Sequence, residues 1–155
     1  MSNPNSYDSN QTILVSGYLW YICWTRGVFD APLDKVWKYL RSDDHKHPSL
    51  KLISRELNGN VVVITAERNV MGKMVTVQIK NTLYPPFGWV QEHIEGPTKG
   101  SKAFVYYIPK EGKTGVTVVG DFHVEGAGEK QTIDAIMTQS QVVFDEDNEN
   151  MKKMK

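Results

Sequence analysis

The hydrophobic residues of this chain change their spacing along the sequence, and the spacing in the middle is the strongest constraint on the fold. From Leu50 to Glu125, apolar and polar residues alternate with a period of two, which is typical of half-buried antiparallel strands. Short turn sequences such as Asn58-Gly59 and Glu111-Gly112-Lys113 interrupt the alternation. Six strands are therefore predicted, at residues 50–57, 61–69, 74–83, 89–95, 102–109 and 116–125. Connections this short favour a meander over a parallel sheet.

The segment before this stretch predicts a seventh strand and a short helix. Residues 19–29 are rich in Trp, Tyr, Ile and Val, which favour strands, and Ala31-Pro32 ends the run. Apolar residues at helical spacing then predict a helix over Leu33–Leu40. The polar segment 42–48 is turn-like, and a second short helix is expected within it.

The segment after the alternating stretch predicts one long helix. From Glu129 to about Lys153 there is no Gly or Pro, and apolar residues recur at intervals near three, four and seven. This spacing predicts an amphipathic helix of about 20 residues, roughly 30 Å long. Its highly charged end, residues 145–155, is expected to fray into solvent.

Together these elements predict an α+β fold, in which a curved seven-stranded antiparallel sheet surrounds the long C-terminal helix. The helix must bury its apolar stripe against the apolar face of the sheet. A helix is only about 10–12 Å across, whereas a twisted sheet of seven strands is wider. Gly120 is expected to leave a further gap on the inner face of the last strand. We therefore expect an internal cavity on the order of a few hundred cubic ångströms, the size of a ligand site.

Length, charge and cysteine content narrow the classes of function. The chain has 155 residues, and we assign residues 12–155 to a single domain and the Ser/Asn-rich residues 1–11 to a disordered tail. Lys plus Arg and Asp plus Glu both number 18, so no net charge attracts nucleic acid or anionic lipid. The apolar stretch 13–24 is too short to span a bilayer. A signal peptide begins with Lys or Arg residues, and residues 1–10 contain neither. We expect a cytoplasmic protein with no nucleic-acid partner and no stable membrane insertion. The lone Cys23 cannot form an internal disulfide.

One motif resembles the opening of a known superfamily. The sequence Val28-Phe29-Asp30-Ala31-Pro32-Leu33-Asp34-Lys35-Val36-Trp37-Lys38-Tyr39-Leu40 is similar to the first strand and Ala-Pro-x-x-x-Val-Trp helix of START/Bet v 1-like (SRPBCC) proteins. The resemblance covers about residues 17–150 and implies the helix-grip fold. Members of that superfamily include lipid carriers, plant hormone-binding proteins, polyketide cyclases, coenzyme Q-binding proteins and co-chaperones, so the resemblance does not select one function. The matching residues are structural, and no catalytic residue is carried over.

Ten residues are predicted to line the cavity, because they are large or face inward on the strands or the apolar stripe of the helix. These are Trp24, Arg68, Val77, Ile79, Trp89, Tyr106, Val118, Phe122, Ile136 and Met137. Arg68 shares a face with Val62, Ile64 and Ala66, so it either orients the polar head group of a ligand or forms a salt bridge across strands. Trp20, Tyr84 and Phe87 are further aromatic residues that suit either the pocket or the core.

Two histidines lie in the densest cluster of titratable residues, Asp43-Asp44-His45-Lys46-His47. His-x-His with nearby carboxylates suits a divalent metal or acid/base chemistry, and a third metal ligand would have to be His93 or His123. Alternation places His123 on the solvent face with Asp121 and Glu125. The other interpretation is a solvated loop at the mouth of the fold. We predict no metal and no cofactor.

Three functions are compatible with these features. The first is binding or carriage of a hydrophobic small molecule, such as a lipid, an isoprenoid or an aromatic metabolite. The second is a cyclase or dehydrase acting on a similar apolar substrate, with His93, Arg68, Tyr106 and Tyr107 as the candidate polar groups. The third is a co-chaperone-like interaction module, which would have a filled core and an exposed apolar patch. The sequence does not determine the oligomeric state.

Overall fold

The structure is a computed structural model that describes residues 22–43 and 45–154, with side chains from Gly27 onward. The predicted tail at residues 1–11 lies outside these ranges. The elements, in chain order, are β1 (Ile22–Phe29), α1 (Leu33–Leu40), β2 (Leu50–Asn58), β3 (Val61–Val70), β4 (Lys73–Tyr84), β5 (Gly88–Glu95), β6 (Lys102–Lys110), β7 (Lys113–Asp121) and α2 (Glu129–Lys153).

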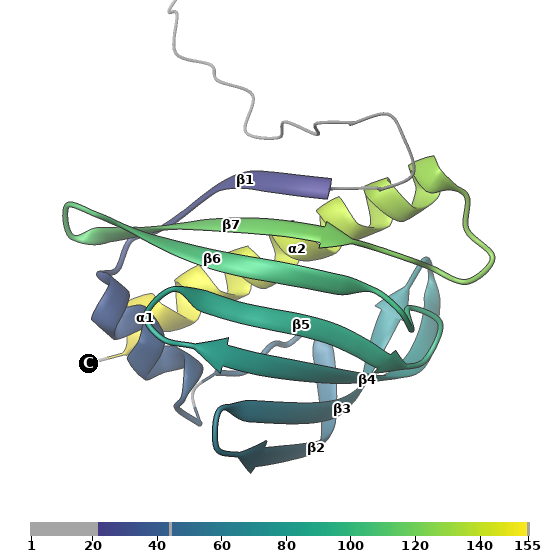
Figure 1. Ribbon diagram of the computed structural model, residues 1–155, viewed down its shortest axis with the longest axis horizontal. Coiled ribbons are helices and arrows are strands. Elements are labelled where there is room, and N and C mark those ends of the chain that lie inside the picture. The colour runs from purple at the N-terminus through teal and green to yellow at the C-terminus, as the bar shows by residue number, and fades with distance from the viewer. Residues whose placement is uncertain (1–21, 44, 155) are drawn as a thin grey trace, which may run out of the picture.

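The described strands form a single seven-stranded sheet in the order β1-β7-β6-β5-β4-β3-β2, and every neighbouring pair is antiparallel. Strands β2 to β7 form the predicted meander, and β1 pairs with β7 at the far edge, so β1 and β2 lie at opposite edges (Figure 1). The α+β fold class is therefore confirmed. The segment 41–43 and 45–49 contains turns and no second short helix in its described residues, so that part of the prediction is wrong.

The last strand is shorter than predicted, because β7 ends at Asp121. Beyond it the backbone leaves the sheet: the His123 N–H donates to Ser101 Oγ (2.8 Å), and the Glu125 N–H donates to the Pro97 carbonyl (2.7 Å). The expected gap at Gly120 is also absent. A Cβ at Gly120 would lie 2.8 Å from the Phe122 ring and from Ala103 Cβ, so neighbouring side chains already occupy that space.

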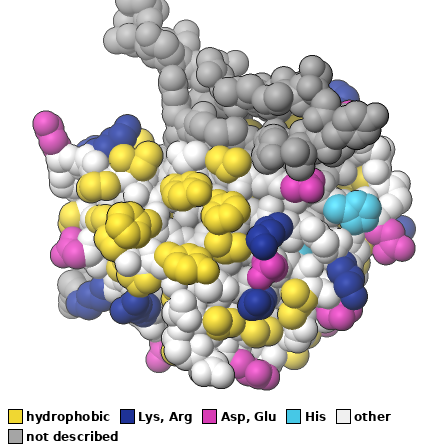
Figure 2. Space-filling model, viewed as in Figure 1, with side chains coloured by type: hydrophobic (Ala, Val, Ile, Leu, Met, Phe, Trp, Pro, Cys, Tyr) yellow, Lys and Arg dark blue, Asp and Glu magenta, His cyan; other side chains and the backbone are white. Residues whose placement is uncertain are grey.

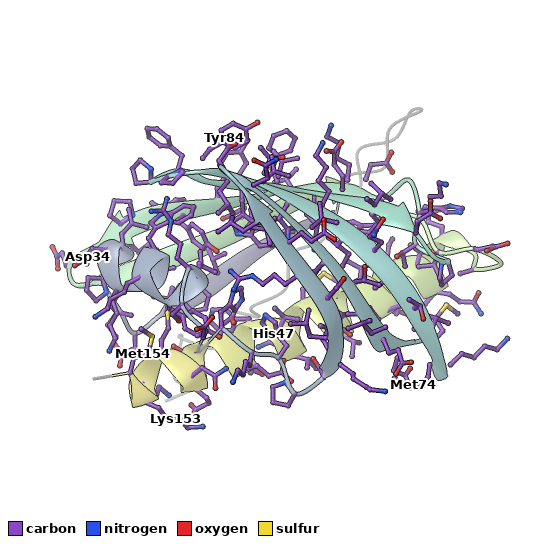
Figure 3. The ribbon with its side chains drawn as sticks, turned by 90° about the horizontal axis from the view of Figure 1, so that it is seen from below. Asp34, His47, Met74, Tyr84, Lys153 and Met154 are labelled. Atoms are coloured by element: carbon purple, nitrogen blue, oxygen red, sulfur yellow. The ribbon has the colours of Figure 1, made fainter. Side chains whose placement is uncertain are left out.

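The sheet arches over α2, and α2 runs along its concave side (Figure 3). The predicted fraying of the C-terminal end of this helix is wrong. Met151 is 2% exposed and Asp147 is 8% exposed, and the Tyr39 hydroxyl on α1 donates to Asp147 Oδ1 (2.7 Å). The Lys35 ammonium also donates to the Met154 carbonyl (3.2 Å), so α1 holds the last turns of α2 in place.

The packed core lies where α1, β1, β6, β7 and the C-terminal half of α2 meet. Phe29 stacks on Phe144 of α2 with ring centroids 4.8 Å apart, and Trp37 meets Tyr107 edge-on at 5.7 Å. Gly27 is required here, because a Cβ at this position would lie 2.5 Å from the Phe144 ring. The core therefore fills one end of the concavity, and the β2–β5 side is left less tightly filled. Neither described helix is long and apolar enough to cross a lipid bilayer.

Candidate functional site

A cavity of about 670 Å³ lies between α2 and the strands β2 to β5. Its apolar lining consists of Leu40, Pro48, Leu50, Leu52, Val62, Ile64, Ile79, Leu83, Trp89 and Val143. Its polar lining consists of His45, Lys46, His47, Arg55, Arg68, Asn81, Gln91, Gln139, Asp147 and Asn150. Several of these residues, including Lys46 and Arg55, are exposed, so the cavity opens to solvent beside β2 and the loop that precedes it.

Two further spaces adjoin this cavity. A recess of about 130 Å³ extends toward the packed core and is lined partly by His93, Tyr107 and Phe122. A cleft of about 590 Å³ lies between the β3–β4 turn and the N-terminal half of α2. Arg68 and Gln139 line all three spaces and so stand at their junction.

Arg68 is the buried cation of this interior. It is 8% exposed, it lies on the inward face of β3 with Val62 and Ala66, and burial lowers its pKa. Its Nε has no hydrogen-bond partner among the described residues, and none of the described carboxylates lies within ion-pair distance of its guanidinium. The salt bridge on this strand belongs instead to its outward neighbour Glu67, which pairs with Lys51 (2.8 Å). Of the two interpretations of Arg68, the cross-strand salt bridge is therefore absent in the described part of the chain.

The recess contains two groups held neutral by burial. His93 is 5% exposed, its Nδ1 lies 2.6 Å from Thr98 Oγ1, and burial, followed by the nearby Arg68 charge, lowers its pKa to about 4. Tyr107 accepts a hydrogen bond from Trp89 Nε1 (2.9 Å), and burial raises the pKa of its hydroxyl. At neutral pH the recess therefore presents an uncharged imidazole and a protonated phenol.

The loop before β2 brings both of its histidines to the mouth of the cavity. Figure 3 shows His47 between α2 and the strands that arch over it. The side chains of His45 and His47 are 26% and 16% exposed, and their Nε2 atoms lie 3.0 Å apart. Asp147 Oδ1 lies 3.6 Å from each of these nitrogens. The interpretation of a solvated loop is wrong for these two side chains, because they point inward and are half-buried.

Glu146 fixes this loop against α2. Its carboxylate accepts hydrogen bonds from the Ser49 N–H (2.9 Å) and Ser49 Oγ–H (2.9 Å), and His47 Nδ1 lies 3.2 Å from its Oε2.

Burial and then the neighbouring His47 lower the pKa of His45 to about 3, and burial raises the pKa of Asp147 to about 6. His45, His47 and Asp147 are the group among the described residues whose ligand atoms lie close enough together to hold a metal ion.

Sequence reasoning missed Asp147 as the partner of these histidines. The two residues suggested instead lie elsewhere: His93 is in the recess, and His123 is exposed, as alternation predicted. A signal for Asp147 did exist. It lies four residues after Val143 and four before Met151, which places a carboxylate on the buried stripe of the helix.

The ten predicted cavity residues fall into five groups. Arg68, Ile79 and Trp89 line the main cavity, and the recess is lined by Arg68 and Trp89 together with Val118, Phe122 and Ile136. Val77 and Met137 belong to the packed interior: Val77 is fully buried, and Met137 packs against the core. The side chain of Trp24 lies outside the described residues. Tyr106 is 46% exposed, so its predicted place in the cavity is wrong.

Tyr106 lies instead on the outer, convex face of the sheet, where hydrophobic side chains gather (Figure 2). Its ring stacks on Phe104 at 5.9 Å, and Tyr84 and Phe87 are also exposed. The neighbouring Tyr107 takes the inward position, because adjacent residues of a strand face opposite sides. The strand β6 thus has aromatic residues on both faces.

Comparison with known proteins identifies the fold. No known family profile and no curated protein matches the sequence. Among solved structures, the chain is similar to the Zhui aromatase/cyclase from Streptomyces sp. R1128, with a TM-score of 0.74, 16% identity, and 88% of this chain and 95% of that chain covered. It is also similar to the protein TTHA0849 from Thermus thermophilus, with a TM-score of 0.70, 14% identity and coverage of 85% and 97%. For Ara h 8.0201 the TM-score is 0.61 at 14% identity, with coverage of 86% and 99%.

These identities are low, so the likeness establishes the fold alone. The chain has the helix-grip fold of START/Bet v 1-like proteins, and the resemblance found at Val28–Leu40 is confirmed at the level of fold.

Proposed function

We propose that the protein binds a hydrophobic small molecule with an anionic or hydrogen-bonding end group in the cavity between α2 and the sheet. The observation that carries this proposal is the buried Arg68, whose Nε has no hydrogen-bond partner and whose guanidinium has no carboxylate partner among the described residues, beside a space of about 670 Å³. Ligand pockets have this size, and they combine apolar walls with polar groups that orient the ligand. A buried charge without a partner destabilises the folded protein, and a ligand that supplies the partner removes that cost.

Titration with fluorescent apolar probes tests the proposal. The anionic 1-anilinonaphthalene-8-sulfonate and the neutral N-phenyl-1-naphthylamine are compared, while native mass spectrometry of the purified protein detects a co-purified ligand. We expect saturable binding of both probes at one site, with the anionic probe bound more tightly. The absence of saturable binding and of any co-purified molecule would contradict the proposal.

A pair of neighbouring substitutions locates the site. Val143 lines the main cavity and the recess, whereas Val142 is 37% exposed on the same helix. Val143→Phe fills part of the cavity and is expected to raise the Kd of the probe roughly tenfold, a loss of about 1.4 kcal/mol. Val142→Phe adds the same atoms outside the cavity and should leave the Kd unchanged. Equal effects of the two substitutions would place the probe elsewhere.

A second candidate function, acid/base catalysis on the bound molecule, is favoured by the recess. His93, Tyr107 and Asp147 all line it, so titratable groups reach the interior. Incubation with a linear poly-β-ketone thioester analogue, followed by liquid chromatography and mass spectrometry, tests for a cyclised product. We expect His93→Asn to lose the product while it still binds the probes. No product above the uncatalysed reaction would rule this candidate out and leave the binding proposal intact.

The third interpretation, an interaction module with a filled core, has less support. The exposed apolar patch that this interpretation requires is present on the convex face of the sheet. The interior, however, contains the cavities described above.

A further inference from the structure

We propose that His45, His47 and Asp147 form a binding site for one divalent first-row transition-metal ion at the mouth of the cavity. Two imidazoles and a carboxylate suit Zn²⁺, Fe²⁺, Co²⁺ and Ni²⁺, and no thiolate is available in the group to favour softer ions. The metal site is independent of the hydrophobic-ligand proposal, since its three ligands come from the protein itself.

The distances fit a metal without rearrangement. The three candidate ligand atoms, His45 Nε2, His47 Nε2 and Asp147 Oδ1, form a triangle with edges of 3.0, 3.6 and 3.6 Å. The point equidistant from the corners of such a triangle lies about 2.0 Å from each. Zinc–nitrogen bonds measure about 2.0–2.1 Å and zinc–carboxylate bonds about 2.0–2.2 Å.

The hydrogen bonds of the two Nδ1 atoms suit metal binding through Nε2. His45 Nδ1 lies 3.3 Å from the Leu40 carbonyl, and His47 Nδ1 lies 3.2 Å from Glu146 Oε2. Both oxygens accept hydrogen bonds, which favours the Nδ1–H tautomer of each neutral imidazole, and in that tautomer both Nε2 atoms present a lone pair. Metal-binding histidines have this pattern, in which the second ring nitrogen donates to a carbonyl or a carboxylate.

Without a cation, this arrangement brings like partial charges together. In the Nδ1–H tautomers, two bare Nε2 atoms face each other at 3.0 Å, and the carboxylate oxygen adds a third electron-rich atom beside them. A bound cation converts the repulsion into three attractive contacts. The surrounding groups also orient the ligands: Tyr39 donates to Asp147 Oδ1 (2.7 Å), and Ser49 holds Glu146 in place.

The site is open toward the interior. All three ligand residues line the main cavity, and Asp147 also lines the recess. Three protein ligands leave a further coordination position for water or for a polar atom of a bound molecule, as in catalytic zinc sites. Only this last role in contacting a guest molecule depends on the proposed function.

Metal binding is measured on the untagged full-length chain after treatment with EDTA and dialysis. Isothermal titration with Zn²⁺ should give one ion per chain. Co²⁺ should give the visible absorption of a four- or five-coordinate site with nitrogen and oxygen ligands, without a thiolate charge-transfer band. Zn²⁺ should raise the Tm of the wild-type protein, because the ion binds the folded state.

Matched variants decide whether these three residues are the ligands. His47→Ala and the isosteric Asp147→Asn should each weaken Zn²⁺ binding more than about 100-fold and abolish the Tm increase. Glu146→Gln, which changes the support of His47 and of the loop but removes no ligand atom, should weaken it about 10- to 100-fold. His123→Ala removes an exposed histidine outside the site and should bind like the wild type. Circular dichroism of each metal-free variant confirms folding.

Binding of less than one ion, or binding that Asp147→Asn and His47→Ala leave intact, would overturn the site. In that case the two histidines share a proton and form an ordinary structural pair. Apolar-probe binding by the metal-free protein is measured in parallel. If the wild-type protein binds the probe but no metal ion, only the metal site is refuted. If it binds the metal ion but no probe, only the hydrophobic-ligand proposal is refuted.

Discussion

Arg68 is 8% exposed, and its guanidinium has no carboxylate beside it in the described part of the chain. Most proteins pair a buried charge or replace it by an apolar side chain, because an unpaired charge is costly. At the junction of the three internal spaces, the proposed ligand would supply the missing partner.

Replacement of Arg68 by methionine should separate stability from binding. Arg68→Met removes the charge and keeps most of the apolar stem, so we expect the metal-free, ligand-free protein to gain about 1–3 kcal/mol in free energy of unfolding. The same variant should lose the preference for the anionic probe over the neutral one. Urea unfolding and the two titrations measure these effects. Arg55→Met, at an exposed position of the same cavity, is the control, and a destabilised Arg68→Met with unchanged probe preference would contradict the argument.

The buried imidazole of His93 should make the protein sensitive to acid. Its pKa falls from the ordinary 6.5 to about 4 on folding, because burial disfavours the charged ring. The unfolded chain therefore takes up a proton near pH 6.5 and the folded chain does not until about pH 4. The contribution of His93 to the free energy of unfolding is complete above pH 6.5. It is lost as the pH falls through this window, by about 2 kcal/mol at pH 5.

His93→Asn isolates this contribution, because the asparagine keeps a polar atom near Thr98 and does not titrate. The difference in free energy of unfolding between pH 7 and pH 5, from urea denaturation, should be smaller in the variant by about 2 kcal/mol. His45, whose pKa also falls, acts in the same direction in both proteins and cancels in the comparison. The same acid sensitivity in both proteins would show that His93 is not the responsible group.

At the scale of elements, α2 carries two tasks along its length. Its C-terminal half packs against α1 and β1 through Phe144 and Met151, and it also presents Glu146 and Asp147 to the loop before β2. Hydrophobicity alone does not explain why the C-terminal end of α2 is packed, since the last eleven residues of the chain are mostly charged or polar. The packing of this end against α1 is what places Asp147 beside the histidines.

Truncation of Met151 tests whether the end of α2 is part of the core. Met151 is 2% exposed, and Met151→Ala should cost about 2–5 kcal/mol in free energy of unfolding, since it leaves a cavity. Met74→Ala, at a position that is 63% exposed on β4, should change the free energy by less than about 0.5 kcal/mol. Similar small effects of both substitutions would mean that the helix end frays in solution.

At the scale of the whole molecule, the two ends of the concavity differ. The end at β1, β6 and β7 is closed by aromatic packing on α2, whereas the end at β2 borders the cavity. Strand β2 is an edge strand that pairs only with β3, and nearly all of its side chains are exposed. We therefore expect the β2 side of the cavity to open locally at a lower free-energy cost than the side formed by β6 and β7.

Hydrogen exchange should reveal this asymmetry. We expect the amides of Leu50–Asn58 in β2 to exchange much faster than those of Lys113–Asp121 in β7, because local opening needs less free energy at an exposed edge. Saturation with an apolar probe should slow exchange in β2 and leave β7 unchanged. Mass spectrometry of the exchanged protein measures both, and equal protection of the two strands would contradict a mobile wall.

The sequence by itself determined the order of the elements, the pairing of β2 to β7 as a meander, the helix-grip fold and the inward direction of Arg68, whereas the pairing of β1 with β7 came from the structure. Each of these follows from local rules: period-two alternation fixes which side of a strand a residue faces, and short turns fix which strands are neighbours. The same rules were ambiguous at Tyr106-Tyr107, because apolar residues occupy both faces of β6, so alternation could not tell the inner ring from the outer one.

Only the tertiary structure decided what meets across long stretches of chain. His47 and Glu146 are 99 residues apart, and the Tyr39–Asp147 hydrogen bond spans 108. The charged end of α2 looked solvated because its local composition is polar, and it is buried because α1 offers Tyr39 and the loop offers two histidines at that place. Periodicity records which way a side chain faces, whereas the partner it meets depends on how separate elements pack in three dimensions.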